Sequence, residues 1–203
     1  MITIINYGMG NLGSVANMLK KIGAPCKITS DINEIEQAKK IILPGVGAFD
    51  AAVSRIDELN LRPVLTYKAK EQKIPFLGIC LGMQLLTRGS EEGVLKGLDF
   101  VPAQTIKFKF EKDSDLKIPH MGWNFVKENT KSKLAEGFTD EYRFYFVHSY
   151  YVLCDKPENS ILKTTHGLEF DSAIQQENVY GAQFHPEKSH KYGMHLLTNF
   201  SKI

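Results

Sequence analysis

Short apolar runs alternate with amphipathic segments through the first part of the chain. The apolar runs are rich in β-branched and aliphatic side chains, and they predict strands at residues 2–6, 26–30, 40–43 and 75–79. The segments between them repeat apolar positions at helical spacing, and they predict helices at about 12–22, 33–38, 48–58 and 62–72. Strands that alternate with helices favour a parallel sheet covered by helices on both faces.

The rest of the chain changes to short β-branched or aromatic runs joined by turns. We expect these runs to form further strands, paired as antiparallel hairpins, at residues 100–110, 142–153, 160–166, 172–176 and 179–184. A last amphipathic segment predicts a helix at about 189–201. Because the sequence contains no repeat, low-complexity tract or linker, we expect a single α/β domain that spans residues 1–203.

The composition is that of a soluble globular protein, with 43% hydrophobic and 24% charged residues in 203. The formal net charge of +2 gives no electrostatic reason to expect a nucleic-acid partner. No apolar run approaches the roughly 20 residues of a membrane helix, and the N-terminus does not resemble a signal segment. The three cysteines, Cys26, Cys80 and Cys154, lack the spacing of a zinc site, which favours a reducing cytoplasm and no bound metal.

A glycine-rich turn near the N-terminus offers one functional interpretation. Gly8, Gly10 and Gly13 form the pattern G-x-G-x-x-G between a predicted strand and a predicted helix, and Asp31 follows about one strand later. This arrangement is typical of dinucleotide-binding proteins, in which the acid binds a ribose. The pattern alone is weak evidence, because the sequence shows no second mononucleotide-binding half and no residues suited to hydride transfer.

A stronger pattern surrounds Cys80 in the stretch "KIPFLGICLGMQLL". An apolar strand runs into the cysteine, Gly78 and Gly82 flank it at i−2 and i+2, and a helical pattern follows at 83–87. G-x-C-x-G is the thiol counterpart of the nucleophile elbow, a tight turn in which small flanking residues let the backbones approach. A helix N-terminus lowers the pKa of a thiol, and the Leu81 N–H points where an oxyanion would develop. The alternative is an inert cysteine buried in a glycine-rich turn.

The stretch "VYGAQFHPEKS" contains a base for such a nucleophile. A predicted strand ends in His185, and Glu187 follows two residues later, where an extended chain points its side chain the same way. Glu187 can therefore hydrogen-bond one imidazole nitrogen while the other nitrogen faces the thiol of Cys80. A lone histidine at a strand end is more often structural, but His-Pro-Glu combined with the elbow favours catalysis.

The two motifs together resemble those of the class I, or triad, glutamine amidotransferases. Two further stretches, "ILPGVGAFD" at 42–50 and "IPHMGWN" at 118–124, most resemble the glutaminase subunits of imidazole glycerol phosphate synthases. The similarity covers essentially the whole chain. It implies an α/β fold with a central, mostly parallel sheet flanked by helices and an additional smaller antiparallel sheet, and it implies no cofactor.

The resemblance also implies a role for each reacting group. Cys80 would attack the side-chain amide carbon of glutamine, giving a thioester and ammonia, while His185 carries the proton and Glu187 orients the imidazole. One oxyanion donor would be the Leu81 N–H. The second would be a backbone N–H of the turn that follows Pro44 and comprises Gly45, Val46 and Gly47. In this family the turn is expected to flip, so that glutaminase activity stays low until a partner binds.

By position, the resemblance implies further residues that bind the substrate and the partner. The expected glutamine-binding residues are Gln84, Glu92, Ser149 and Tyr150. The residues expected at the partner interface or along the ammonia route are Asn11, Met121, Trp123, Tyr145 and Lys188. The alternatives are a core position for Trp123, the single tryptophan, and an ordinary solvated lysine at Lys188.

The partner that the resemblance implies is a cyclase subunit built as a (β/α)8 barrel, which uses ammonia on a phosphoribosyl-type substrate. The first alternative is a paralogous subunit that supplies ammonia for sugar amidation in surface-glycan biosynthesis. The second is a nucleotide-binding or flavodoxin-like module without catalysis. A papain-like cysteine hydrolase fits poorly, because Cys80 lies mid-chain on a strand-to-helix turn.

Overall fold

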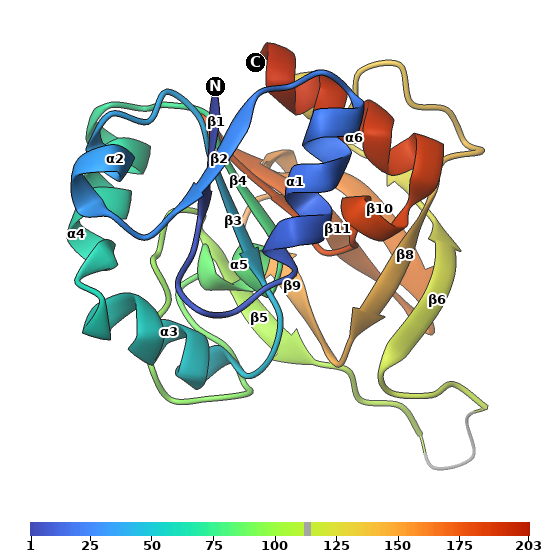
Figure 1. Ribbon diagram of the computed structural model, residues 1–203. Coiled ribbons are helices and arrows are strands. Elements are labelled where there is room, and N and C mark those ends of the chain that lie inside the picture. The colour runs from blue at the N-terminus through green and yellow to red at the C-terminus, as the bar shows by residue number, and fades with distance from the viewer. Residues whose placement is uncertain (112–114) are drawn as a thin grey trace.

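A ten-stranded mixed sheet forms the centre of the protein in the computed structural model, which describes residues 1–111 and 115–203 (Figure 1). Its parallel half has the order β2–β1–β3–β4–β12. The bounds are β1 (Ile2–Ile5), β2 (Cys26–Thr29), β3 (Ile41–Gly45), β4 (Phe76–Cys80) and β12 (Val179–Ala182). The predicted parallel strands of the first part of the chain are therefore confirmed, and the fifth position is taken by a strand from near the C-terminus.

The other half of the large sheet is antiparallel and continues from β12. It comprises β11 (Leu168–Gln176), β10 (Ser160–His166) and β7 (Lys127–Glu128), with β9 (Tyr150–Cys154) paired to both β11 and β5 (Ala103–Lys107). A separate antiparallel sheet contains β6 (His120–Phe125) and β8 (Arg143–His148). The predicted α/β fold with an additional smaller antiparallel sheet is confirmed, although the antiparallel strands make up half of the large sheet.

Helices cover both faces of the parallel half (Figure 1). One face carries α1 (Leu12–Lys21) and α6 (His190–Lys202), and the other carries α2 (Ile32–Glu36), α3 (Phe49–Glu58) and α4 (Leu61–Thr66). The buried strands supply apolar side chains to both layers in alternation: Ile4 packs on the α1 side and Ile5 on the opposite side. The sheet therefore separates two hydrophobic cores, as the predicted alternation of strands and helices requires.

Two predicted elements differ from the structure in detail. The run predicted as one strand at 142–153 divides at Ser149, so that β8 joins the small sheet while β9 joins the large one. The segment predicted as one helix at 62–72 is α-helical only to Thr66. A π-helix follows over Tyr67–Glu71, and the Gln72 N–H donates a hydrogen bond to the Tyr67 carbonyl. Apolar periodicity predicts neither the division at Ser149 nor the π-helix, because both depend on contacts with segments that are distant in sequence.

The glycine-rich N-terminal turn packs against the turn that follows β3. A Cβ atom on Gly10 would lie 3.3 Å from the Pro44 carbonyl group, and one on Gly47 would lie 2.8 Å from the Met9 methyl group. Asp31 caps α2 by accepting a hydrogen bond of 3.0 Å from the Glu34 N–H. The turn and the acid therefore both have structural roles outside dinucleotide binding.

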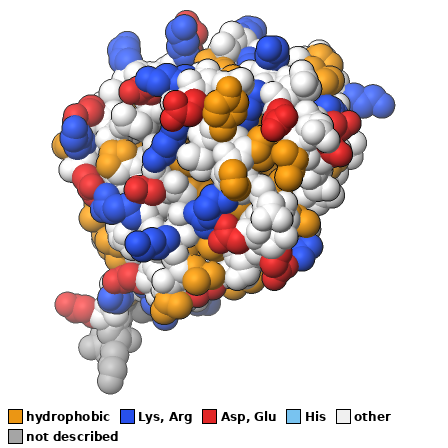
Figure 2. Space-filling model, turned by 90° about the vertical axis from the view of Figure 1, so that its left-hand side faces the viewer, with side chains coloured by type: hydrophobic (Ala, Val, Ile, Leu, Met, Phe, Trp, Pro, Cys, Tyr) orange, Lys and Arg blue, Asp and Glu red, His pale blue; other side chains and the backbone are white. Residues whose placement is uncertain are grey.

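The surface shows charges of both signs interspersed on the face that Figure 2 displays, with apolar side chains scattered among them. This mixture agrees with a net charge near zero, +2 over the whole sequence. None of the helices in the described part of the chain has the length and apolar character needed to cross a bilayer.

Three backbone segments meet closely at the end of β4. A Cβ atom on Gly82 would lie 1.8 Å from the Leu43 carbonyl oxygen, and one on Gly78 would lie 2.5 Å from the Gly82 carbonyl oxygen. Both contacts are with backbone atoms, which cannot rotate away as a side chain does. Glycine at these two positions is therefore a packing requirement of the turn around Cys80.

We expect Gly82→Ala to lower the free energy of unfolding by about 3 kcal/mol, because the added methyl group forces β3 away from the turn. Urea denaturation measures the loss. The matched control is Gly13→Ala in α1, where a Cβ atom meets nothing within 4 Å, and this change should stabilise by up to about 1 kcal/mol. Equal stability of Gly82→Ala and the unchanged protein would show that the close contact with β3 is wrong.

Candidate active site

Three parallel strands bring the candidate catalytic groups to one edge of the sheet. The strand β4 lies between β3 and β12, and the register places Gly45 opposite Cys80 and Ala182 opposite Ile79. Because the carboxyl ends of parallel strands meet at one edge, the Pro44–Gly47 turn, Cys80 and His185 follow three neighbouring strands. Cys80 and His185, which are more than 100 residues apart in the sequence, are thus brought together because β12 pairs with β4.

Cys80 occupies a strained backbone conformation at the junction of β4 and α5 (Leu81–Leu85). Its φ and ψ angles are 54° and −112°, a region that non-glycine residues rarely occupy. Its thiol is free, and the residue is 7% exposed at the wall of a pocket. The helix begins at Leu81, two residues earlier than predicted, and has only five residues.

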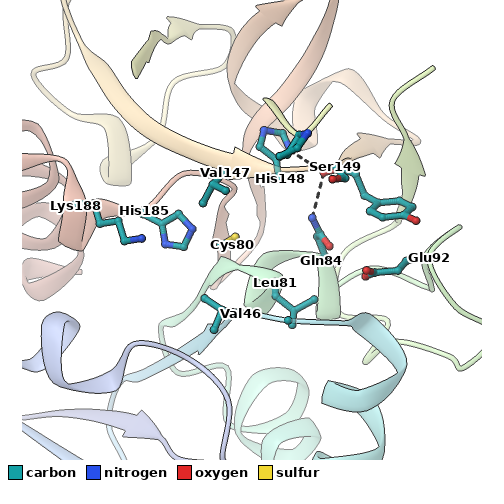
Figure 3. A pocket seen from close by; sticks show the side chains of 13 residues that line it. Val46, Cys80, Leu81, Gln84, Glu92, Val147, His148, Ser149, His185 and Lys188 are labelled. Atoms are coloured by element: carbon teal, nitrogen blue, oxygen red, sulfur yellow. Dashed lines mark hydrogen bonds between the residues drawn. The ribbon is translucent and has the colours of Figure 1, made fainter. Parts of the chain in front are cut away.

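His185 lies beside Cys80 (Figure 3) and forms a buried pair with Glu187. The Glu187 Oε1 atom lies 2.8 Å from the His185 Nδ1 atom, and the two side chains are 3% and 2% exposed. Burial disfavours the imidazolium, but hydrogen bonds to the Cys80 sulfur and the Glu187 carboxylate outweigh this and raise the pKa of His185 to about 10. The Nδ1 atom of His185 is thus engaged by the carboxylate, and its Nε2 atom is left for the sulfur of Cys80.

The turn expected to supply the second oxyanion donor faces the same pocket. Val46 is 44% exposed, and Val46 and Gly47 line the pocket together with Cys80 and Leu81 (Figure 3). Gly47 has a φ angle of +111°, which residues other than glycine rarely adopt. The turn is thus exposed and held in place on one side by the glycine-rich N-terminal turn.

The pocket has a volume of about 360 Å³ and contains all four residues expected to bind glutamine (Figure 3). The Gln84 Nε2 atom donates to the Tyr150 carbonyl oxygen at 3.2 Å and to the Gln183 Oε1 atom at 3.1 Å. Glu92 lies across the pocket from His185 (Figure 3). Its carboxylate accepts a hydrogen bond from the Phe49 N–H. A small elongated molecule with polar ends fits such a space.

A chain of buried side chains that sequence reasoning missed supports the Ser149–Tyr150 wall of the pocket. His148 Nδ1 lies 2.7 Å from the Tyr150 carbonyl oxygen and must donate to it, so His148 Nε2 accepts from His120 Nδ1 at 2.9 Å. His120 Nε2 in turn accepts from the Asn124 amide at 3.1 Å. Each imidazole is therefore neutral with its proton on Nδ1.

The pKa values of these two histidines agree with this assignment. Burial, followed by the nearby His166, lowers the pKa of His120 to about 4. Burial also lowers the pKa of His148 to about 3, although its bond to the Tyr150 carbonyl acts in the opposite direction. The only sequence signal was a histidine in each of two apolar strands, and the pairing of His120 with His148 depends on the β6–β8 register.

The residues expected at the partner interface lie on or beside the small sheet, with one exception. Met121 and Trp123 on β6 are 62% and 45% exposed, which rules out the core alternative for Trp123. Trp123 pairs across the strands with Tyr145, and the Lys188 ammonium lies 5.6 Å from the centre of the Tyr145 ring. Asn11 is exposed at the start of α1, on a different element.

Among the residues that the structure describes, no three histidine, cysteine, aspartate or glutamate side chains converge in a way that could hold a metal ion. All three cysteines are free thiols. Cys154 lies on β9, where burial, followed by the nearby Asp171, raises the pKa of its thiol well above the usual range. Cys80 is therefore the cysteine with both access to a pocket and a basic partner.

Comparison with known proteins gives a full-length match. A family model for class-I glutamine amidotransferases matches residues 3–203. The chain is 54% identical to imidazole glycerol phosphate synthase subunit HisH 2 of Methanococcus maripaludis, covering 100% of this chain and 99% of that protein. It is 46% identical to subunit HisH of Bdellovibrio bacteriovorus and 45% identical to subunit HisH 2 of Pseudomonas aeruginosa, with complete coverage of both chains in each case.

A solved structure described as a glutamine amidotransferase has the same fold. It superposes with a TM-score of 0.73 at 15% identity and covers 100% of both chains. The similarity to this structure is one of fold.

We expect the two buried histidines to make stability depend on pH below 6.5. In the unfolded chain they take up protons near pH 6.5, whereas the folded pKa values of about 4 and 3 keep them neutral. Stability should therefore fall from pH 6.5 towards pH 4 by up to about 1.4 kcal/mol per pH unit for each histidine. His185 adds no slope there, because its pKa is raised and its contribution is fully present below pH 6.5.

Urea unfolding at pH 7, 6 and 5 measures this slope. The slope should become shallower in His148→Asn and remain in His190→Asn, which alters an exposed histidine. A stability that is flat between pH 6.5 and 5 would contradict the neutral hydrogen-bonded chain.

Proposed function

The chain belongs to the class I glutamine amidotransferase family, and we propose that it is the glutaminase subunit of an imidazole glycerol phosphate synthase. In this role it hydrolyses glutamine to glutamate and ammonia, and it passes the ammonia to a cyclase subunit in histidine biosynthesis. The observation that carries the proposal is that Cys80 and His185 line one pocket, with Glu187 hydrogen-bonded to His185, in a chain whose full-length relatives are named as such subunits.

The proposed reaction begins with attack of the Cys80 sulfur on the side-chain amide carbon of glutamine. The negative charge that develops on the amide oxygen is met by the Leu81 N–H and by a backbone N–H of the Pro44–Gly47 turn. His185 transfers its proton to the departing nitrogen, so that ammonia leaves and a thioester remains on Cys80. His185 then accepts a proton from water, which attacks the thioester and releases glutamate, while Glu187 holds the imidazole in place throughout.

The pocket supports a definite orientation for the substrate. The amide must lie at Cys80, which places the amino and carboxylate groups of glutamine towards Gln84, Glu92, Ser149 and Tyr150 at the opposite side. The Glu92 carboxylate is of the right charge to bind the α-ammonium group. Backbone groups at Ser149 and Tyr150, held by the buried histidine chain, are suited to the other end of the amino acid.

A bound partner follows from the chemistry of the product. Ammonia near neutral pH is mostly ammonium, which is a poor nucleophile, so an enclosed route to the acceptor is required. We propose that a (β/α)8-barrel cyclase subunit covers Met121, Trp123 and Tyr145 on the exposed small sheet and Lys188 beside it, with Asn11 at the margin. The single domain over residues 1–203 and a reducing cytoplasmic location, suited to three free thiols, are parts of the same proposal.

The alternative to the proposed function is a different acceptor for the ammonia. Two of the relatives carry the numeral 2 in their names, so the names distinguish more than one subunit of this type. A paralogous subunit that supplies ammonia for sugar amidation in surface-glycan biosynthesis would use the same glutaminase site. The difference between the two functions lies in the acceptor and leaves the reaction at Cys80 unchanged.

Replacing the nucleophile tests the proposed glutaminase reaction. In a complex with the cyclase subunit, Cys80→Ala should lower glutamine-dependent synthesis by at least about 1,000-fold, because no thioester can form. Synthesis from added ammonium salt should continue, since the acceptor site lies on the partner. Cys26→Ala, on β2, is the matched control and should leave both reactions intact. Glutaminase activity retained in Cys80→Ala would overturn the assignment.

Titration with the cyclase subunit of the same organism tests the partner. Glutamine turnover should rise at least about 10-fold on binding, as expected for coupling through the turn. Trp123→Ala should weaken binding by about 30-fold, whereas Leu153→Ala should not, although the two side chains are similarly exposed at 45% and 48%. Binding and turnover that do not respond to this cyclase, with ammonia transferred instead to a sugar by a co-purified enzyme, would favour the alternative pathway.

A further inference from the structure

Two carboxylates connect the exit of the Pro44–Gly47 turn to the loop that carries Glu92. The Glu92 Oε2 atom accepts a hydrogen bond of 2.9 Å from the Phe49 N–H, at the start of α3. In the opposite direction, Asp50 in the first turn of α3 accepts from the Val94 N–H at 2.9 Å and from the Leu95 N–H at 3.0 Å. We name this reciprocal pair, Asp50 and Glu92 with the three N–H groups they accept from, the carboxylate clamp.

The carboxylate clamp replaces the local cap that α3 lacks. Ala48 stands at the N-cap position and has no side chain that could accept from the first-turn N–H groups. Glu92, more than 40 residues further along the chain, supplies the acceptor instead. The position of Glu92 and the start of α3 are therefore fixed by each other.

The loop is built to let Asp50 approach. A Cβ atom on Gly93 would lie 2.0 Å from the Asp50 Oδ1 atom, so glycine is needed directly beside Glu92. On its other side Glu92 is held by its backbone N–H, which donates to the Ser90 hydroxyl at 3.1 Å. The loop around Glu92 is thus held by Asp50 on one side and by the Ser90 hydroxyl on the other, and the Glu92 side chain extends from it into the pocket.

We propose that Asp50 is a positioning residue for glutamine, which acts by holding the loop at 92–95 so that Glu92 can bind the α-ammonium group. The proposal rests on the proposed glutaminase function. Glu92 lies across the pocket from Cys80 and His185 (Figure 3), where the amino end of the substrate must lie once its amide meets the sulfur. With Oε2 engaged by the Phe49 N–H, the second oxygen, Oε1, is the one presented to the ammonium.

A positioning role for Asp50 predicts an effect on substrate preference that a general loss of stability would not produce. If Asp50 acts through Glu92 on the ammonium, replacing Asp50 should weaken the binding only of substrates that carry an α-ammonium group. An amide of the same length without the α-amino group, 5-amino-5-oxopentanoic acid, tests this separation. It keeps the reacting amide and the carboxylate and lacks the ammonium.

The experiment measures kcat/KM for both compounds with the full chain in the presence of the cyclase subunit. Asp50→Asn should lower the preference for L-glutamine over the des-amino amide about 10-fold, mainly through KM for glutamine, and should leave kcat/KM for the des-amino amide within about twofold. Gly93→Ala, which displaces the Asp50 carboxylate, should act in the same direction. Asp57→Asn is the matched control, since it removes the same charge from the same helix at an ion pair with Arg62, and it should leave the preference unchanged.

A double variant separates action through Glu92 from an independent effect. Glu92→Gln should also reduce the preference, and adding Asp50→Asn to it should reduce the preference no further. An unchanged preference in Asp50→Asn, or additive losses in the double variant, would overturn the positioning role while the glutaminase function stands. Failure of the unchanged protein to hydrolyse glutamine would instead overturn the proposed function.

Discussion

The close approach of β3 to the turn after β4 is the constraint on which the rest of the site depends. Gly82 packs on the Leu43 carbonyl oxygen with no room for a side chain, and Gly78 packs on Gly82. Cys80 lies between these two glycines with a φ angle of 54° and a ψ angle of −112°, at the carboxyl end of β4. The same contact sets the Pro44–Gly47 turn beside the sulfur, because Gly45 is in register with Cys80. The proposed nucleophile and the proposed oxyanion-binding turn are thus positioned by one packing relation.

Two kinds of environment give histidines of this protein opposite properties. His185 and His148 are both buried near the pocket, yet the pKa of His185 is raised to about 10 and that of His148 is lowered to about 3. His185 has a carboxylate and a thiol as partners, which favour the imidazolium. His148 has a carbonyl and a neutral imidazole as partners, so burial decides and the ring stays neutral. The first can therefore transfer protons, whereas the second serves as a fixed donor that holds the wall of the pocket.

The sequence was most informative where function depends on local geometry. The strands and helices of the first part of the chain follow from apolar periodicity, and the elbow around Cys80 follows from two glycines at fixed spacing. The contact of Glu187 with His185 could be predicted from their closeness in sequence, although Pro186–Lys188 forms a 3-10 turn and the extended geometry expected there is wrong. The break at Ser149, the neutral histidine chain and the link between Asp50 and the loop after Glu92 could not be predicted. Each of these arises from segments distant in sequence, whose pairing no local pattern encodes.

The position of β12 bears on the order in which the chain can be completed during synthesis. This strand lies between β4 and β11, in the middle of the sheet, but it comes from the last 25 residues. Until it is made, the edge of β4 that pairs with β12 is open, and Cys80 lies at the end of that strand without His185 beside it. The sheet therefore cannot close before β12 has been made, and the open edge of β4 is available until then to strands of other molecules, which favours aggregation.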